Sequence, residues 1–347
     1  MSPGNMFKVA LFGATGESGG QILRGLLASQ EPIFKVTVLA REAASSKPAY
    51  SKLRAEGIEV VAVDLELPDA DIARRLQGQD IVIASVPPNA LEGQLPLIRA
   101  ARLANVKRFV PSSFAMAIAA GGVCGVQDAK EKVYTTLAAS GVPYTIIDVG
   151  WWYNGFIPVL PSGRTASVIA APEFIRNLVP GDGTMKTHVI DQDDLGKIVA
   201  LAIVDPRTLN QRVMASSVAL SFNEIFGIVE SLTGEMPAGK YVSFLSTVIP
   251  RFPNSLQVSA QELQQMIAEY KTISQRNPQD YLAFVRATWL EYYYSSFING
   301  DNSPEGVRRL GYLVATDLYP DFEAGSFETF LSETLNNQRR VPYSDRF

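Results

Sequence analysis

The first 150 residues alternate between short apolar runs and segments with helical periodicity, and this alternation constrains the fold more than any other feature of the sequence. The apolar runs are of strand length, and the segments between them place apolar residues three or four positions apart. Strands that alternate with helices predict βαβ units, and therefore an α/β fold with a doubly wound parallel sheet of Rossmann type. The predicted strands are 7–13, 34–40, 57–65, 80–86, 106–113 and 144–150, and the predicted helices are 19–29, 69–78, 92–105 and 129–140.

Three glycines, Gly13, Gly16 and Gly19, follow the first predicted strand and open the first helix as GxxGxxG. Glycine permits a tight turn and lets the backbone approach a diphosphate closely, while the helix N-terminus offers unpaired N–H groups and partial positive charge. Because the trio stands at the start of a βαβ unit, it predicts a dinucleotide-binding loop. The alternative is a purely structural turn.

Arg41 ends the second predicted strand, where NAD-dependent enzymes place an Asp or Glu that binds the ribose 2′-hydroxyl. A guanidinium cannot accept that hydrogen bond, but it pairs well with a 2′-phosphate. Arg41 therefore favours NADP(H) over NAD(H), although Glu42 directly after it keeps the preference from being absolute. The alternative is that Arg41 is a solvated charge on a loop.

Composition sets the class of protein and excludes several functions. The chain has 347 residues, enough for two lobes, and we expect a nucleotide-binding domain over 1–155 and a smaller, mainly helical substrate lobe over 156–347, some segments of which return to the sheet. The 31 basic residues are interleaved with 35 acidic ones, so nucleic-acid binding is not expected. No apolar run approaches the roughly 20 residues of a membrane span. With a single cysteine, Cys124, this predicts a cytoplasmic protein.

Few residues can carry proton chemistry. The sequence has no Tyr-x-x-x-Lys, and His188 is its only histidine, so neither a Ser-His-Asp arrangement nor a His/Cys metal site is expected. Lys130 starts the helix after the fifth predicted strand, at the rim where a nicotinamide would lie, and a positive helix end there would lower its pKa. The alternative is that Lys130 and Lys132 are exposed helix charges.

Six short motifs follow one another along the chain in this order: "GATGESG", "VLAR", "NVKRFVPSSF", "GVPYTII", "DPRTLN" and "LYPD". Together they resemble the NmrA-like atypical short-chain dehydrogenases, and within them the isoflavone reductase-like group, which includes isoflavone, pinoresinol–lariciresinol and phenylcoumaran benzylic ether reductases. The resemblance implies that Lys130 is catalytic, three residues before Val133. It also implies that NADP(H) contacts Gly13, Thr15, Gly16, Glu17, Ser18, Gly19, Arg41, Ser85, Val86, Pro87, Gln94, Ser112, Phe114 and Lys130.

The sequence departs from the family pattern on the substrate side. The family's PSEFG is "PSSFA" here, so that Ser113 replaces Glu and Ala115 replaces Gly, and its SSN has become "DVG", with Gly150 in place of Asn. The plant substrates therefore do not transfer to this chain. The residues expected on the substrate side are Met116, Gly150, Trp151, Trp152, Tyr153 and Phe156.

Aromatic residues gather in two places, in "DVGWWYNGF" and in residues 284–300. The first cluster fits either a pocket for a flat ligand or core packing that joins the lobes. The second fits a substrate lid, a dimer surface or core. We expect His188 to be structural, and Asp191, Asp193 and Asp194 to cap the helix that follows them.

Two functions remain open from the sequence. The first is an NADPH-dependent reductase that delivers hydride to a conjugated, aromatic small molecule at a C=C bond, quinone methide, imine or carbonyl. The second is a non-catalytic NADP(H) sensor that regulates a protein partner, as the resemblance to NmrA itself implies. A homodimer is a possible assembly in either case.

Overall fold

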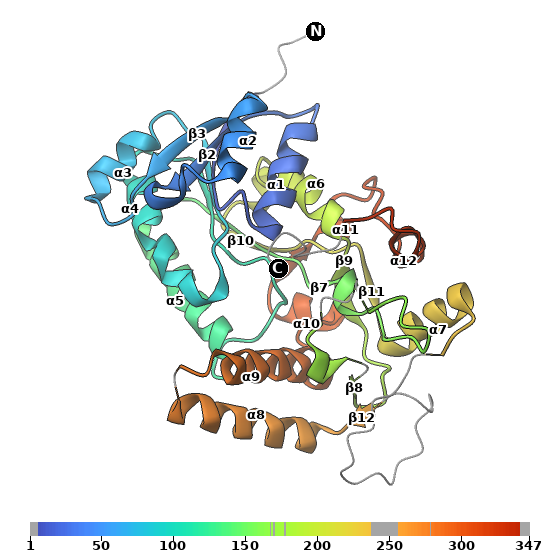
Figure 1. Ribbon diagram of the computed structural model, residues 1–347. Coiled ribbons are helices and arrows are strands. Elements are labelled where there is room, and N and C mark those ends of the chain that lie inside the picture. Colours follow the sequence, from blue (N-terminus) through green and yellow to red (C-terminus); the bar gives the residue numbers. More distant parts are fainter. Residues whose placement is uncertain are drawn as a thin grey trace.

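The strands of the main sheet follow the βαβ order that the sequence predicts. The computed structural model describes residues 6–166, 168, 171–176, 178–236, 256–277 and 279–340 (Figure 1). Its central sheet has the order β3-β2-β1-β4-β5, with every neighbouring pair parallel. These strands are β1 (Met6–Phe12), β2 (Ile33–Arg41), β3 (Glu59–Val63), β4 (Ile81–Ala84) and β5 (Arg108–Val110).

The sheet continues into residues from the second half of the chain. Phe109 of β5 bridges to Tyr144, next to β6 (Thr145–Asp148). Strand β6 pairs in parallel with β10 (Gln211–Met214), which pairs in parallel with β13 (Tyr312–Val314). Carboxyl ends of parallel strands share one edge of a sheet, so the residues after β1, β4, β5 and β6 come together there. The expected doubly wound α/β fold is confirmed.

Helices cover both faces of this sheet, as buried parallel strands require. On one face lie α1 (Glu17–Ala28) and α6 (Gln192–Ala202), which contact so closely that a Cβ on Gly25 would stand 2.1 Å from the Gly196 carbonyl carbon. On the other lie α3 (Asp69–Arg75), α4 (Leu95–Leu103) and α5 (Gly125–Ser140). An additional helix, α2 (Pro48–Ala55), begins at a proline, which suits the first helical turn.

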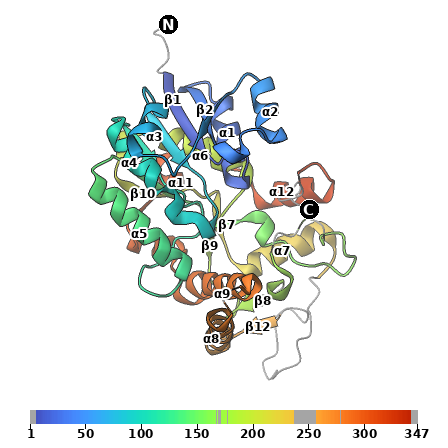
Figure 2. The same ribbon diagram turned by 60° about the vertical axis from the view of Figure 1, so that its left-hand side comes forward.

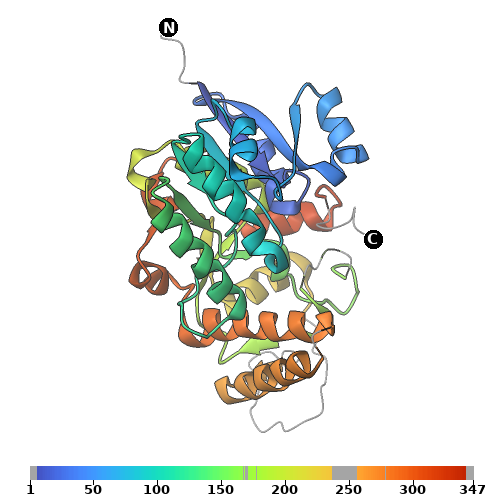
Figure 3. The same ribbon diagram turned by 90° about the vertical axis from the view of Figure 1, so that its left-hand side faces the viewer.

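Most of the remaining elements form a second layer at the end of the molecule away from β2 and β3, whereas α10 (Pro304–Arg309) and α11 (Ala315–Leu318) pack against β13 (Figures 2 and 3). Strands β7 (Trp151–Trp152), β9 (Thr187–Ile190) and β11 (Val218–Leu220) make a small sheet, and β8 (Leu178–Pro180) pairs with β12 (Leu256–Val258). The helices are α7 (Phe222–Thr233), α8 (Ala260–Arg276), α9 (Tyr281–Tyr293), α10 (Pro304–Arg309), α11 (Ala315–Leu318) and α12 (Phe327–Leu335). A π-helical turn, Tyr294–Asn299, extends α9. Within the described ranges, each helix is too short or too polar to cross a membrane.

Candidate active site

The glycine loop connects β1 to α1 at the carboxyl edge of the sheet and leaves no room for side chains. Gly13 has φ +89°, and a Cβ there would stand 1.9 Å from the Ser85 carbonyl oxygen. A Cβ on Gly19 would stand 2.1 Å from the Gly13 carbonyl oxygen. The loop therefore needs glycine at both positions, because a backbone carbonyl already occupies the space that a Cβ would take at each.

The start of α1 is open to an anion. Gly16 is the N-cap and supplies no side chain to cap the helix, and the first helical bond runs from Gly20 N–H to Gly16 O at 2.8 Å. The N–H groups of Glu17, Ser18 and Gly19 consequently have no helical carbonyl to bond. This combination of a bare turn and an uncapped helix N-terminus fits a diphosphate.

Arg41 is the last residue of β2 and is exposed at the same edge of the sheet. Its guanidinium makes no hydrogen bond or ion pair with the part of the chain that the structure describes, so it is available to a bound phosphate. Thr15 is also exposed, and its hydroxyl oxygen lies 3.5 Å from the hydroxyl oxygen of Tyr50 on α2. Both predicted binding residues thus lie at the carboxyl edge of the sheet, with Thr15 next to α2.

Gln94 and Ser112 hold the ends of β4 and β5 together. The Ser112 hydroxyl donates to Val86 O (2.9 Å) and accepts from Val86 N–H (3.0 Å). Oε1 of Gln94 accepts from Ser112 N–H at 2.8 Å, and Nε2 donates to Leu91 O at 2.9 Å. Both side chains are buried, so they position the Ser85–Pro87 segment and leave Pro87 exposed at the rim.

Lys130 is buried rather than exposed, on the inner side of α5. Its ammonium donates to Ser113 O at 3.0 Å and lies 3.7 Å from Oδ1 of Asp148, the last residue of β6. Asp148 also accepts from the Ser113 hydroxyl and, at 2.6 Å, from the Tyr312 hydroxyl. Burial lowers the pKa of Lys130, while the carboxylate of Asp148 opposes that shift.

Phe114 and Gly150 both take left-handed backbone where these strands end. Phe114 has φ +38°, a costly value for a bulky residue, and its N–H donates to Ile147 O at 3.0 Å. Gly150 has φ +71°, and a Cβ there would stand 2.2 Å from His188 O. The glycine that replaces the family's asparagine is therefore required by the close approach of β9. Met116, on the same connection, is buried.

The aromatic residues after β6 pack into the interior. Trp151 is buried, donates through Nε1 to the Ser296 hydroxyl at 3.0 Å, and contacts the rings of Phe156, Tyr293 and Phe297. The two aromatic clusters of the sequence thus form one cluster between the layers. Tyr153 is buried against α12, with its hydroxyl on Gly325 O at 2.8 Å, whereas Trp152 is half-buried.

His188 and the acidic residues around α6 have structural roles. The Nδ1 atom of His188 lies 2.7 Å from the Ser216 hydroxyl, and burial lowers the pKa of this histidine to about 4. Asp191 is the N-cap of α6 and accepts from Asp193 N–H at 3.1 Å, which confirms the capping prediction for this residue. Asp193 and Asp194 lie in the first turn of the helix instead. Among the described residues, no group of three or more His, Cys, Asp or Glu side chains is arranged to hold a metal ion.

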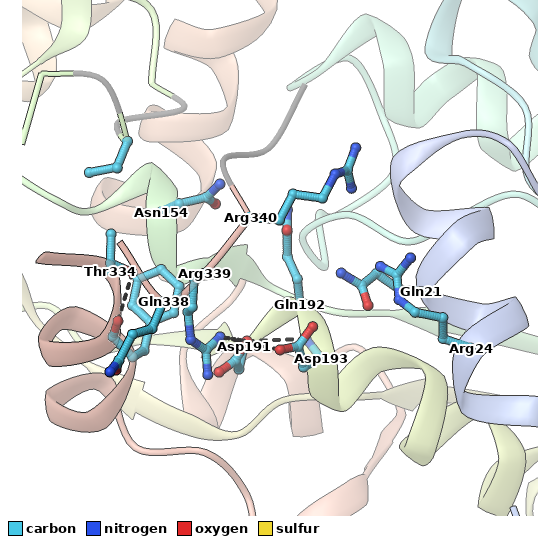
Figure 4. A pocket seen from close by; sticks show the side chains of 12 residues that line it. Gln21, Arg24, Asn154, Asp191, Gln192, Asp193, Thr334, Gln338, Arg339 and Arg340 are labelled. Atoms are coloured by element: carbon cyan, nitrogen blue, oxygen red, sulfur yellow. Dashed lines mark hydrogen bonds and ion pairs between the residues drawn. The ribbon is translucent and has the colours of Figure 1, made fainter. Parts of the chain in front are cut away.

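A cavity of about 330 Å³ lies beside this site, between α1, α6, α12 and the residues after α12 (Figure 4). Its walls include Gln21, Arg24, Asn154, Gln192, Arg339 and Arg340. Sequence reasoning missed all six of these residues, because they come from four separate stretches and form no motif.

Comparison with known proteins gives a consistent result over nearly the whole chain. The model of the NmrA-like family matches residues 6–331. Asnovolin J 5′,6′-dehydrogenase nvfM of Aspergillus novofumigatus is 35% identical over 329 residues, which cover 94% of this chain and 95% of that protein. Phenylcoumaran benzylic ether reductase IRL1 of Ginkgo biloba is 26% identical, over 94% of this chain and 98% of that protein. The structure of AtPrR2 with NADP⁺ and (+)pinoresinol superposes with a TM-score of 0.72 at 22% identity, over 95% and 99% of the two chains.

Proposed function

Since the chain belongs to the NmrA-like family, we propose that it is an NADPH-dependent oxidoreductase of the isoflavone reductase-like group. The observation that supports this most strongly is the bare turn at Gly13, next to an uncapped α1 and the exposed Arg41. A diphosphate fits the N–H groups of Glu17, Ser18 and Gly19, and a 2′-phosphate fits the guanidinium of Arg41. When bound, NADPH supplies a hydride.

The nicotinamide half is assigned to the edge where β4, β5 and β6 end. Ser85, Val86 and Pro87 form one side of it, held in place by Ser112 and Gln94. Residues 1–155 bind the nucleotide in this proposal, and residues 156–347 build the substrate side. The two lobes approach each other closely at Gly150, beside the His188 carbonyl.

Lys130 is the proposed proton donor. Its ammonium is held by Ser113 O and Asp148, and burial lowers its pKa, which makes release of a proton easier than from an exposed lysine. A proton from Lys130, relayed by water or given directly, neutralises the heteroatom or carbon that becomes negative as hydride arrives. Asp148 keeps the ammonium charged between turnovers.

The proposed substrate is a conjugated, ring-bearing small molecule of the secondary-metabolite type. The names of the relatives support this class, since they include an asnovolin J dehydrogenase and a phenylcoumaran benzylic ether reductase. Met116, Gly150 and the half-buried Trp152 border the substrate, with Trp151, Tyr153 and Phe156 as the apolar wall behind them. Such a wall excludes water from the hydride-transfer site.

Calorimetric titration of the purified chain with NADPH and NADH, followed by an NADPH-oxidation screen against aromatic enones and quinone methides, tests this function. We expect NADPH to bind more tightly and at least one acceptor class to be reduced. Binding without any turnover would favour the alternative, a non-catalytic NADP(H) sensor. Absence of binding would contradict both.

A further inference from the structure

The residues after α12 return to the first turn of α1, at the opposite end of the sequence. The two guanidinium nitrogens Nη1 and Nη2 of Arg340 each lie 3.2 Å from a carboxylate oxygen of Glu17, across 323 positions of sequence. Glu17 is largely covered, with 11% of its side chain exposed, whereas 45% of the Arg340 side chain is exposed. The pair is therefore a bidentate contact at the rim of the glycine loop.

Arg339 fixes this segment in place. Its guanidinium lies 2.7 Å from Oδ1 of Asp191 at the start of α6 and 2.7 Å from Oε2 of Glu333 on α12, and it lies over the Phe330 ring at 4.9 Å. Figure 4 shows Arg339 at the acidic end of α6 and Arg340 directed toward α1. The adjacent residues Arg339 and Arg340 thus connect the N-termini of α6 and α1. Because Arg339 is held in place, the Arg340 side chain is kept close to Glu17.

Glu17 has an unfavourable place in a loop that binds a diphosphate. It is the first residue of α1, so its carboxylate lies within one helical turn of the N–H groups that would hold the phosphates. A carboxylate is favourable at an empty helix N-terminus, because it faces the positive end of the dipole. Once phosphates arrive, the same charge repels them, and at this range in a partly buried site the repulsion is not fully screened.

We propose that Arg340 is a cofactor-binding determinant: it neutralises Glu17 and thereby allows the α1 N-terminus to hold the diphosphate of NADP(H), with Arg339 as its positioning residue. This inference rests on the function proposed above. It assigns the residues after α12 to the nucleotide site, although they lie outside the expected nucleotide domain. It also explains why an acidic residue is tolerated in this loop.

A double-mutant cycle on the full chain tests the proposal, with the dissociation constant of NADP⁺ measured by calorimetry as the readout. Arg340→Gln should weaken binding about tenfold, because it removes the positive charge that faces the Glu17 carboxylate beside the diphosphate. Glu17→Gln should bind as tightly as the wild type or more tightly. The double variant should resemble Glu17→Gln, because the carboxylate that Arg340 pairs with is already gone.

Three further variants complete the experiment. Arg340→Lys should restore most of the affinity, since charge rather than shape carries the effect, and Arg339→Ala should weaken binding in the same direction as Arg340→Gln. Arg308→Gln is the control variant. It breaks another Arg–carboxylate pair, in which Arg308 lies 2.8 Å from Asp317, away from the glycine loop, and it should leave the dissociation constant unchanged.

Equal losses from Arg340→Gln in the wild-type and Glu17→Gln backgrounds would overturn the proposal, as would no loss in either. Thermal unfolding of each variant separates a folding defect from a binding defect. Failure of the wild-type chain to bind NADP⁺ would instead remove the proposed function itself, so the two failures are distinguishable.

Discussion

The ammonium of Lys130 lies 3.7 Å from Oδ1 of Asp148, and the two side chains are only 5% and 0% exposed. This pair stands where α5 and β6 meet below the Ser113 carbonyl. Fully buried ion pairs are costly to desolvate. The hydroxyls of Tyr312 and Ser113 donate hydrogen bonds to the Asp148 carboxylate and offset part of that cost. The arrangement holds one proton at a defined place rather than adding much stability.

Lys130→Ala should lower kcat about 10²-fold or more while NADPH still binds, because the side chain is proposed to act in proton transfer. Steady-state kinetics and calorimetry measure the two effects separately. Lys132→Ala, which removes an exposed lysine from the same helix, is the matched control and should keep full activity. Unchanged turnover in Lys130→Ala would remove Lys130 from the mechanism.

Loss of Lys130 also leaves Asp148 buried without its cation, which costs about 3–5 kcal/mol in comparable cases. The Lys130→Met, Asp148→Asn double variant removes both charges and should recover much of the lost stability without recovering activity. Thermal unfolding alongside the kinetics then shows that the loss of turnover is chemical.

Arg41→Asp should weaken NADPH by well over tenfold and change NADH little or improve it, because the charge facing the 2′-phosphate is reversed. Titration with both nucleotides gives the ratio directly. Arg75→Gln, an exposed arginine on α3, serves as a control for net charge. Equal losses for the two nucleotides would mean that the 2′-phosphate is recognised elsewhere.

Gly13→Ala should abolish NADPH binding and destabilise the fold by about 1–3 kcal/mol, since the new Cβ meets the Ser85 carbonyl oxygen at a positive φ. At Gly20, seven residues along, a Cβ would stand 3.5 Å from its nearest neighbour, Ala14 O, so Gly20→Ala should be neutral or stabilising. Chemical denaturation and nucleotide titration of both proteins check this contrast. Tight NADPH binding by Gly13→Ala would show that the turn does not carry the diphosphate.

The stability of the protein should fall as the pH drops from about 6.5 to about 4, because burial lowers the pKa of His188 to about 4 in the folded state. Above pH 6.5 the imidazole is neutral in both states, and below it the unfolded chain binds the proton first, which favours unfolding. The full effect is on the order of 3 kcal/mol. Denaturant unfolding at several pH values measures it, and since His188 is the only histidine, His188→Asn should lack this part of the slope.

The glycine loop and Arg41 were predictable because their signals are local. Gly19 is required by the carbonyl of Gly13 in the same loop, Gly13 has a positive φ, and Arg41 ends the strand that precedes it. The Ser85 carbonyl that also excludes a Cβ at Gly13 is distant in sequence and was not predictable. Trp151 was harder, since an apolar aromatic suits a ligand pocket and a core equally well. Only its contacts with Tyr293 and Phe297, from the far end of the chain, place it in the core.

The alternation of strands and helices, the glycine loop and the family could therefore be predicted from the residues alone, because periodicity and glycine spacing act over a few positions. The burial of Lys130 beside Asp148, the bond from Tyr312 to Asp148 and the return of Arg340 to Glu17 were decided by tertiary structure. Those contacts join residues that are 164 positions apart in one case and 323 in the other. No local pattern records such pairs, since they depend on which faces of the sheet and helices pack together.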